Sequence, residues 1–462
     1  AHVVREQERP EGAFLREQHC DAAADALLVV VGEGTVPGSL GKALGAALSE
    51  ALKDGDLAYK AGRCLYLYRL AGVKASRVVF AAAADASVKA FRAAVLAGLG
   101  LIKGGGAKHL LVASALPQPT GGDQAQALLG AVGDALYVYR HTKPSAPAAS
   151  KLERVSLACT VSESAAAREG LTRGEAIAAG VALARECANR PGNHCTPEYL
   201  ASQAKRLGKD FGLSVQVLGR KEVEKLGMGC FLAVAQGSKE PLKFIVAKYH
   251  GAAKSVAPLV LVGKGITFDT GGISIKPAAE MDEMKFDMGG AASVLGTLRA
   301  VAQLKPKINL VGLIPACENM PSGTAVKPGD VVTSLSGQTV EILNTDAEGR
   351  LILCDALTYA ERFKPAAVVD IATLTGACVV ALGHHRSGLF SPDDALAAEL
   401  DRAGQLALDP CWRMPLDEEY DEGLKSNFAD MGNVGPRAGG AVTAAMFLRR
   451  YTGKYRWAHL DI

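Results

Sequence analysis

The sequence predicts an α/β fold, with a smaller N-terminal α/β domain followed by a larger domain whose mostly parallel central sheet is covered by helices. Three observations lead to this prediction. The chain has 462 residues, which is too long for one ordinary hydrophobic core. Short apolar segments alternate with helix-favouring segments along its length. The composition, 49% apolar and 21% charged, is typical of globular proteins.

Hydrophobic patterns place the elements of the first third of the chain. We expect strands over 26–34, 76–84, 108–116 and 151–160, with helices over 91–100 and 124–136. The Pro- and Ser-rich segment 141–150 indicates a surface loop. Residues 162–188 favour a long helix that ends at the turn-forming residues 189–193. We therefore place an N-terminal domain at 1–164, a connecting helix at 165–184 and a second domain at 185–462.

The second domain shows the same alternation. We expect strands over 213–219, 241–250, 258–268, 308–319 and 366–375, and helices within 287–304 and 351–363. Apolar strands joined by crossover helices imply a mostly parallel sheet with both faces covered.

Charge and hydropathy argue against several classes of protein. The net charge of +3 gives no overall basic field of the kind that binds nucleic acid. No run of about 18 apolar residues could span a membrane. The charged start AHVVREQERPEGAFLREQHC is unlike a signal peptide, and its lack of an initiator Met indicates a processed or trimmed terminus. The ten cysteines form no CxxC pair, so we interpret them as buried, reduced thiols of a cytoplasmic protein.

Charged residues interrupt or follow apolar strands in two stretches of the second domain. The stretch VGKGITFDTGGISIKPAAEMDEMKFDMGG carries Lys264, Asp269, Lys276 and Asp287. The stretch NTDAEGRLILCDAL carries Asp346, Glu348 and Arg350. In α/β proteins the site usually lies beside the ends of the strands. Four carboxylates gathered there would repel one another unless cations lay between them, so we predict a cluster of divalent ions and a hydrolytic reaction.

The acidic residues also have purely structural interpretations. Asp269 could begin a turn, and Asp287 could cap the helix that follows it. Asp346 and Glu348 could lie in a solvated turn, whereas in an extended segment both would face one ion. Together these interpretations are weaker, because acids that end apolar strands on separate segments are seldom buried without a partner or a metal.

The basic residues leave more than one role open. Lys264 lies inside the apolar run VLVGKGITF, without the spacing of a phosphate-binding loop. It could pair with a carboxylate, or lose its proton and bind metal through nitrogen, and spacing does not decide between the two. Lys276 and Arg350 could polarise a carbonyl and hold a small anion, or form salt bridges with surplus acids.

These motifs resemble those of the leucyl aminopeptidase family, also called cytosol aminopeptidases. NTDAEGRL, residues 344–351, is similar to the family's signature octapeptide. Residues 262–290 resemble its metal-binding segment, and ANRPGNHCTPEYL, residues 188–200, resembles the entry to its catalytic domain. The resemblance is strong over the second domain and weak over the first.

The resemblance implies a dinuclear metal centre and a set of residue roles. It implies two divalent ions, usually zinc, with manganese or magnesium able to replace the more labile one. Asp269 and Glu348 would bridge the ions, Asp346 would complete one shell, and Lys264 with Asp287 would complete the other. Lys276 and Arg350 match the family's two catalytic positive residues. The positions that line or order the substrate site would be Met284, Asn344, Thr373, Leu374 and Gly376.

The resemblance also implies an activity and partners. The expected reaction is hydrolysis of the N-terminal residue of peptides, preferably apolar and Leu-like, by a water that bridges the metals. A bicarbonate beside Arg350 would act as the base. The family assembles as homohexamers, and family members usually continue beyond the position of Ile462. Some bacterial members also bind DNA, for which the candidate residues here are Arg77, Lys89, Arg92, Lys103 and Lys108.

Another two-metal hydrolase, such as a phosphoesterase, is the alternative enzyme class. Those sites usually use histidines, whereas the nine histidines of this chain are scattered. His384 and His385 have no acidic residue near them in the sequence, so we interpret them as solvated or structural.

Overall fold

The computed structural model describes residues 23–462, so the N-terminal segment with Cys20 lies outside the described residues. The chain divides into two compact units between Ala179 and Gly180. The helix α4 (Val161–Asn189) contains this point of division. The domain boundaries predicted at 164 and 184 stay predictions. Within residues 23–462, no helix is long and apolar enough to cross a membrane.

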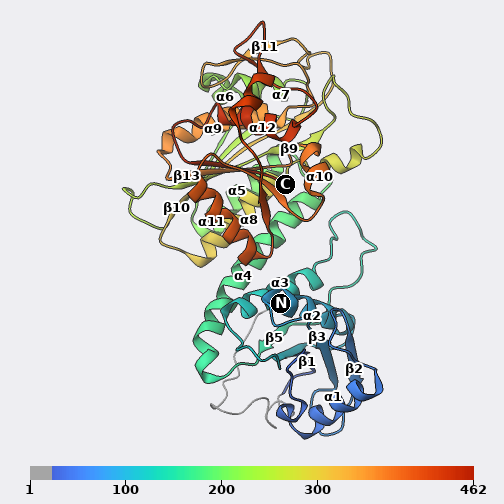
Figure 1. The fold of residues 1–462 in the computed structure, drawn as a ribbon. Helices are drawn as coiled ribbons and strands as arrows, with labels where there is room; N and C mark the ends of the chain where they lie inside the picture. Colours follow the sequence, from blue (N-terminus) through green and yellow to red (C-terminus); the bar gives the residue numbers. More distant parts are fainter. Residues whose placement is uncertain (1–22) are drawn as a thin grey trace. The chain divides into compact units, whose positions relative to one another are not determined.

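The first unit contains a five-stranded sheet with the strand order β2-β3-β1-β4-β5 (Figure 1). Strand β2 is antiparallel to β3, and the other neighbouring strands are parallel. The strands are β1 (Ala26–Val31), β2 (Cys64–Tyr68), β3 (Arg77–Ala82), β4 (His109–Ser114) and β5 (Arg154–Leu157). The helices are η2 (Pro37–Leu40), α1 (Lys42–Asp54), α2 (Val88–Ile102) and α3 (Gly122–Leu136).

Strand β1 shows why this sheet is covered on both faces. All of its residues are buried. Leu28 and Val30 belong to the core that contains residues of α2 and α3, whereas Leu27 and Val29 belong to the core that contains residues of α1. Alternate residues of a strand point to opposite faces, so an uninterrupted apolar run is the pattern of a strand with helices on both sides.

The second unit is built on a nine-stranded sheet. Eight strands follow the order β15-β14-β17-β13-β8-β10-β7-β6, and β9 pairs with β10. The pairs β6–β7, β7–β10 and β14–β17 are antiparallel. The central pairs β17–β13, β13–β8, β8–β10 and β9–β10 are parallel. The sheet contains β6 (Ser214–Leu218), β7 (Lys243–His250), β8 (Leu259–Gly263), β9 (Gly265–Asp269), β10 (Asn309–Asn319), β13 (Ala367–Ala372), β14 (Ser387–Phe390), β15 (Cys411–Arg413) and β17 (Trp457–Asp461).

Helices cover both faces of this sheet, and a small second sheet lies beside it. Leu313 of β10 packs in the core formed with α7, α9 and α12, while its neighbour Ile314 packs in the core formed with α5 and α8. The helices are α5 (Pro197–Phe211), α6 (Arg220–Leu226), α7 (Gly229–Ala235), η3 (Met281–Phe286), α8 (Gly289–Leu304), α9 (Gly349–Ala360), η4 (Glu361–Phe363), α10 (Gly376–Leu382), α11 (Asp394–Ala407), η5 (Glu418–Leu424) and α12 (Gly440–Arg449). The small sheet contains β11 (Val331–Thr333), β12 (Thr339–Glu341) and β16 (Met431–Gly432).

The strand predicted over 258–268 is in fact two strands, β8 and β9, separated at Lys264. The main chain of Lys264 leaves the β8–β10 ladder. Its N–H donates to the Ile371 carbonyl at 3.0 Å, and its carbonyl accepts from the Ala291 N–H at 2.9 Å. A Cβ atom on Gly290 would lie 1.9 Å from the Ile371 carbonyl oxygen, so glycine is needed for the start of α8 to approach this break.

Candidate functional site

The charged residues predicted from the sequence meet at the carboxyl ends of the central strands. Lys264 follows β8, and Asp269 is the last residue of β9. Strands β13, β8 and β10 are parallel neighbours, and β9 is parallel to β10. Parallel strands present their carboxyl ends at the same edge of a sheet, where α/β proteins usually build their sites. The position of the cluster therefore follows from the topology.

The loop between β12 and α9 brings two further carboxylates to this edge. Asp346 lies in a turn, and Glu348 directly precedes the first residue of α9. Glu348 is 2% exposed, whereas the side chain of Asp346 is 31% exposed. Carboxylate oxygens of Asp269, Asp346 and Glu348 all lie within 4.8 Å of one another. The two loop acids thus converge through a turn and a helix start, not through an extended segment.

Asp287 reaches the cluster from the end of η3. Helix α8 begins at Gly289, and no side chain caps its N-terminus. Instead, Asp287 Oδ1 accepts hydrogen bonds from Lys264 Nζ at 2.7 Å and from Thr373 Oγ1 at 2.6 Å. Among the described residues, nothing donates a hydrogen bond to its buried Oδ2. The interpretation of Asp287 as a helix cap is therefore wrong, and one buried acceptor remains for a cation.

Lys264 is buried between two carboxylates. Its Nζ lies 2.7 Å from Asp287 Oδ1 and 2.8 Å from Glu348 Oε1, and it donates to the Thr373 carbonyl at 3.0 Å. A Cβ atom on Gly349 would lie 2.6 Å from Lys264 Cε, so only glycine at this position lets the start of α9 lie against the Lys264 side chain. Burial by itself would lower the pKa of Lys264, but Asp287 and Glu348 raise it overall. Lys264 therefore pairs with carboxylates here, and its role as a metal ligand stays a prediction.

Lys276 bridges the other two carboxylates. Its Nζ lies 2.8 Å from Asp269 Oδ2 and 2.5 Å from Asp346 Oδ1. Asp269 is further fixed at Oδ1 by the Gly271 N–H at 2.9 Å and by Asn319 Nδ2 at 2.8 Å. The side chain of Lys276 is 20% exposed, while that of Asp269 is 2% exposed. Lys276 is thus the positive group of the cluster that a bound molecule can reach.

The cluster is short of positive charge. Its four carboxylates share two ammonium groups. Burial raises the pKa of the carboxyl groups of Asp287, Asp346 and Glu348, and the negative charge of Asp269 raises each of them further. The lysines oppose this rise without cancelling it. The raised pKa values show that the charged carboxylates are incompletely compensated, which is the condition that bound divalent cations would relieve.

The donor set fits such cations. It offers carboxylate oxygens, among them the hydrogen-bond-free Oδ2 of Asp287, and the nitrogen of Lys264 would join them as a ligand only after losing its proton. Carboxylate oxygens suit hard divalent ions, and a mixed oxygen and nitrogen set also suits zinc. The second group of possible ligands, Cys230, Cys354 and Asp355, is different, because both oxygens of Asp355 already accept backbone N–H bonds from Phe231 and Leu335.

Arg350 lies in the first turn of α9 and is 7% exposed. Its Nη1 donates to the main-chain carbonyl of Asn433 at 2.9 Å, while its Nε is buried without a hydrogen bond among the described residues. Burial lowers the pKa of Arg350 to about 10, against the raising effect of Glu348 and Asp461, so the guanidinium stays charged at neutral pH. A buried charged donor without a partner is suited to a small anion.

The residues predicted to line or order the substrate site lie around the cluster in different ways. Thr373 donates to Asp287, and Asn344 Oδ1 accepts the Asp346 N–H at 2.9 Å, so these two order the carboxylates. The Leu374 N–H donates to Asp461 Oδ1 at 3.0 Å. The remaining two differ in exposure: Met284 in η3 is half-buried, and Gly376 at the start of α10 is exposed.

Several buried polar residues of this region were not predicted from the sequence, among them Asn319, Asn433 and Asp461. Asn319 ends the predicted strand 308–319, and its position after an apolar run was a signal of the same kind as that of Asp269. Asp461 likewise ends a buried strand, β17, whereas Asn433 carries no comparable signal. His384 and His385 are exposed, in agreement with their interpretation as solvated residues.

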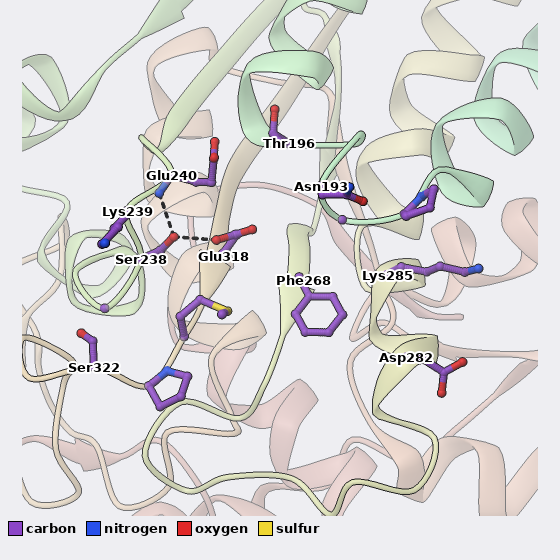
Figure 2. Close-up of a pocket in the computed structure, with 15 residues that line it drawn as sticks. Asn193, Thr196, Ser238, Lys239, Glu240, Phe268, Asp282, Lys285, Glu318 and Ser322 are labelled. Carbon is purple, nitrogen blue, oxygen red and sulfur yellow. Dashed lines mark hydrogen bonds between the residues drawn. The ribbon is translucent and has the colours of Figure 1, made fainter. Parts of the chain in front are cut away.

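A cavity of 840 Å³ lies on the other side of β9. Figure 2 shows Phe268 pointing into it, whereas Asp269, the next residue, contacts Lys276 in the cluster. On its wall Glu318 Oε2 accepts from Ser238 Oγ at 2.6 Å (Figure 2). None of the four carboxylates lines this cavity, although η3, which supplies Asp282 and Lys285 to its wall, directly precedes Asp287.

Comparisons with known proteins show which family and fold this chain resembles. Residues 182–462 match the family model described as the catalytic domain of the cytosol aminopeptidase family. A probable cytosol aminopeptidase of Methylibium petroleiphilum is 69% identical over 440 residues, which cover 95% of this chain and 90% of the relative. One from Polaromonas naphthalenivorans is 60% identical over 447 residues, covering 96% and 86%. Among solved structures, a bottromycin maturation enzyme in complex with Mn superposes with a TM-score of 0.83 at 34% identity, covering 95% of this chain and 92% of that one.

Proposed function

The chain belongs to the cytosol aminopeptidase family, and from this premise we propose how its own residues carry out the reaction. The family model confirms the family predicted from the sequence, and the similar solved structure confirms the predicted α/β fold. It also makes the protein an aminopeptidase, a hydrolase that removes N-terminal residues from peptides with the help of divalent metal ions. The number and identity of the ions, the preferred residue and the roles of individual side chains are the proposal.

We infer that Lys264, Asp269, Asp287, Asp346 and Glu348 hold two divalent ions. One observation carries this inference. Four carboxylates converge but have only two lysines as partners, and the pKa values of the Asp287 and Glu348 carboxyl groups are raised. Asp269, Asp346 and Glu348 would together supply oxygen ligands, because their carboxylate oxygens lie within 4.8 Å of one another. Zinc or manganese is proposed, and the Mn bound to the bottromycin maturation enzyme is consistent with manganese.

Divalent ions held there would supply Lewis-acid polarisation of the scissile carbonyl and a water of lowered pKa. The chain's own groups would do the rest. Lys276, partly exposed at the rim of the carboxylates, would donate to the carbonyl oxygen as negative charge develops on it. Arg350 would hold a bicarbonate through its unbonded Nε, placing a basic oxygen beside the reaction. No histidine is among the described residues of this cluster, so the bound bicarbonate would supply the general base that the side chains lack.

We propose a preference for apolar, Leu-like first residues. Met284, Thr373, Leu374 and Gly376 would line the pocket for that side chain, and Asn344 would order the adjoining loop. A soft apolar wall discriminates weakly, by about 1–3 kcal/mol per methylene, so neighbouring apolar residues would also be accepted.

The test compares two chromogenic substrates on chelator-treated protein with and without added Mn²⁺ or Zn²⁺. We expect hydrolysis of leucine p-nitroanilide that is lost on exhaustive chelation and returns with metal, and no hydrolysis of p-nitrophenyl phosphate. Peptidase activity that survives complete removal of metal would overturn the proposal. Phosphatase activity without peptidase activity would instead support the phosphoesterase alternative.

A homohexamer, a cytoplasmic location and a second role in DNA binding stay predictions. Two of the five residues considered for DNA contact lie beside acids in the structure: Arg92 pairs with Asp134, and Lys108 Nζ lies 3.7 Å from Glu153. A gel shift across a salt series tests DNA binding, because binding through phosphates weakens steeply as salt increases.

A further inference from the structure

One fully buried amide holds the loop that carries two of the four carboxylates. Asn433 directly follows β16 and is 0% exposed. Its Oδ1 accepts the N–H groups of Leu343 at 2.8 Å and Asn344 at 3.3 Å. Its Nδ2 donates to the carbonyls of Asn344 at 2.7 Å and Ala347 at 3.3 Å. The side chain thus uses both donors and both acceptor positions of its amide on one short segment.

The main chain of Asn433 fixes the same site from a second direction. Its carbonyl accepts Arg350 Nη1 at 2.9 Å, and its N–H donates to the Glu341 carbonyl at 2.9 Å. The residue is anchored by the parallel pairing of β16 with β12, in which Glu341 lies opposite Gly432. A single rigid position therefore sets both the loop of Asp346 and the guanidinium group of Arg350.

The loop needs such an anchor because it has little regular structure of its own. Residues 342–348 lie between β12 and α9 and contain only a bend and a turn. The N–H groups of Asp346 and Ala347 bond to Asn344 within the loop, but the N–H groups of Leu343, Asn344 and Thr345 find their partners outside it. By occupying Nη1 of Arg350, Asn433 also leaves the Nε of that residue as the buried donor without a hydrogen bond.

We propose that Asn433 is a positioning residue of the active site, acting through Asp346, Glu348 and Arg350. This inference rests on the proposed function, because it assigns Asn433 to the geometry of that metal centre. Groups that orient metal ligands typically change metal affinity or activity by about 10–100-fold when they are replaced. Asn433 is expected to act in this way on the carboxylates and on Arg350 together.

The experiment compares Asn433→Asp with a matched control, Asn309→Asp. Asn309 is also buried, and its amide makes the same kinds of hydrogen bond: Nδ2 donates to the carbonyls of Ala253 and Val256, both at 2.9 Å, and Oδ1 accepts the Ala252 N–H at 3.2 Å. It lies at the first residue of β10, whereas the cluster lies at the last, roughly 30 Å along the strand. Either substitution replaces two amide donors with a carboxylate that cannot donate.

Four quantities are measured on each variant of the whole chain: Mn²⁺ affinity by titration calorimetry, kcat and KM at saturating Mn²⁺, and the thermal midpoint. For Asn433→Asp we expect Mn²⁺ affinity to fall about 10–100-fold and kcat to fall at least tenfold, with a smaller change in KM. For Asn309→Asp we expect a lowered midpoint with wild-type Mn²⁺ affinity and kcat. The variant Asn433→Ser, which retains one donor and one acceptor, should lie between Asn433→Asp and the wild type.

Two results would overturn the inference. One is wild-type Mn²⁺ affinity and kcat in Asn433→Asp, and the other is equal losses in Asn433→Asp and Asn309→Asp. If Asn433→Asp does not fold, the same measurements on Asn433→Ser decide the question. Failure of the proposed function looks different, because the wild-type protein itself would then lack metal-dependent peptidase activity.

Discussion

Replacing Glu348 by Gln should separate metal binding from folding. Glu348 is 2% exposed, and burial together with the charge of Asp269 raises its carboxyl pKa. A buried acid with a raised pKa destabilises the folded protein at neutral pH by about 1.4 kcal/mol for each tenfold weakening of the acid. The amide removes that cost, while Lys264 keeps Asp287 at 2.7 Å as its partner. In the presence of chelator, we therefore expect Glu348→Gln to unfold at the same temperature as the wild type or slightly above it.

With metal present, the order should reverse. An ion supplied at one hundred times its dissociation constant stabilises the folded protein by about 2.7 kcal/mol. A hundredfold weaker site under the same conditions contributes only about 0.4 kcal/mol. The loss of about 2 kcal/mol corresponds to a thermal midpoint roughly 4–8 °C lower than that of the metal-loaded wild type. The assay is thermal unfolding with chelator and with Mn²⁺, alongside metal analysis of the same samples.

Asp370→Asn is the matched control for this substitution. Asp370 is 0% exposed and accepts hydrogen bonds from Trp457 Nε1 at 2.6 Å and His459 Nδ1 at 2.5 Å. An amide can satisfy only one of these donors, so the control should lose about 1–3 kcal/mol with or without metal. The reasoning is refuted if Glu348→Gln destabilises the chelated protein as the control does and keeps its Mn²⁺-dependent rise in midpoint.

Two further predictions concern protons and Lys276. Burial raises the carboxyl pKa values of Asp287, Asp346 and Glu348. Their protonation therefore stabilises the folded, metal-free protein at acidic pH. This stabilisation is lost as the pH rises from about 4 through the raised pKa values of the folded protein. A bound metal ion must displace these protons, so Mn²⁺ affinity should increase from about pH 5 to pH 8, and binding should release protons. Calorimetry in two buffers of different ionisation enthalpy measures the protons released. A Mn²⁺ affinity that is independent of pH would contradict this prediction. Lys276→Met should lower kcat about 10²–10³-fold while metal content stays at the wild-type level; steady-state kinetics within threefold of wild type would remove Lys276 from the reaction.

Much of the fold could be predicted because hydrophobic patterns act locally. The predicted strands at 26–34, 108–116 and 308–319 contain β1, β4 and β10, and the predicted helix at 162–188 lies inside α4. These segments are buried on both faces or strongly helix-favouring, so tertiary contacts reinforce what the local pattern already indicates.

The break at Lys264 could not be predicted, because partners distant in sequence produce it. Ile371 and Ala291 hold the main chain of Lys264 out of the ladder. From the sequence alone, the run VLVGKGITF has the pattern of one continuous strand. Tertiary hydrogen bonds here override the strand propensity of the segment.

The predicted site residues do converge, but the backbone conformation that brings them together is not always the expected one. Asp346 and Glu348 come together through a turn and a helix start, and Asp287 does not cap α8. The support of the site was hidden from the sequence. Asn433 lies more than 80 residues from the groups of the loop that it binds, and no local spacing predicts such a contact.

The most direct test of the cation cluster is an anomalous-scattering map from crystals of the active protein prepared with Mn²⁺. We expect two peaks, both bounded by the carboxylates of Asp269, Asp287, Asp346 and Glu348. A map from active protein with no manganese among these carboxylates would contradict a metal centre at this site.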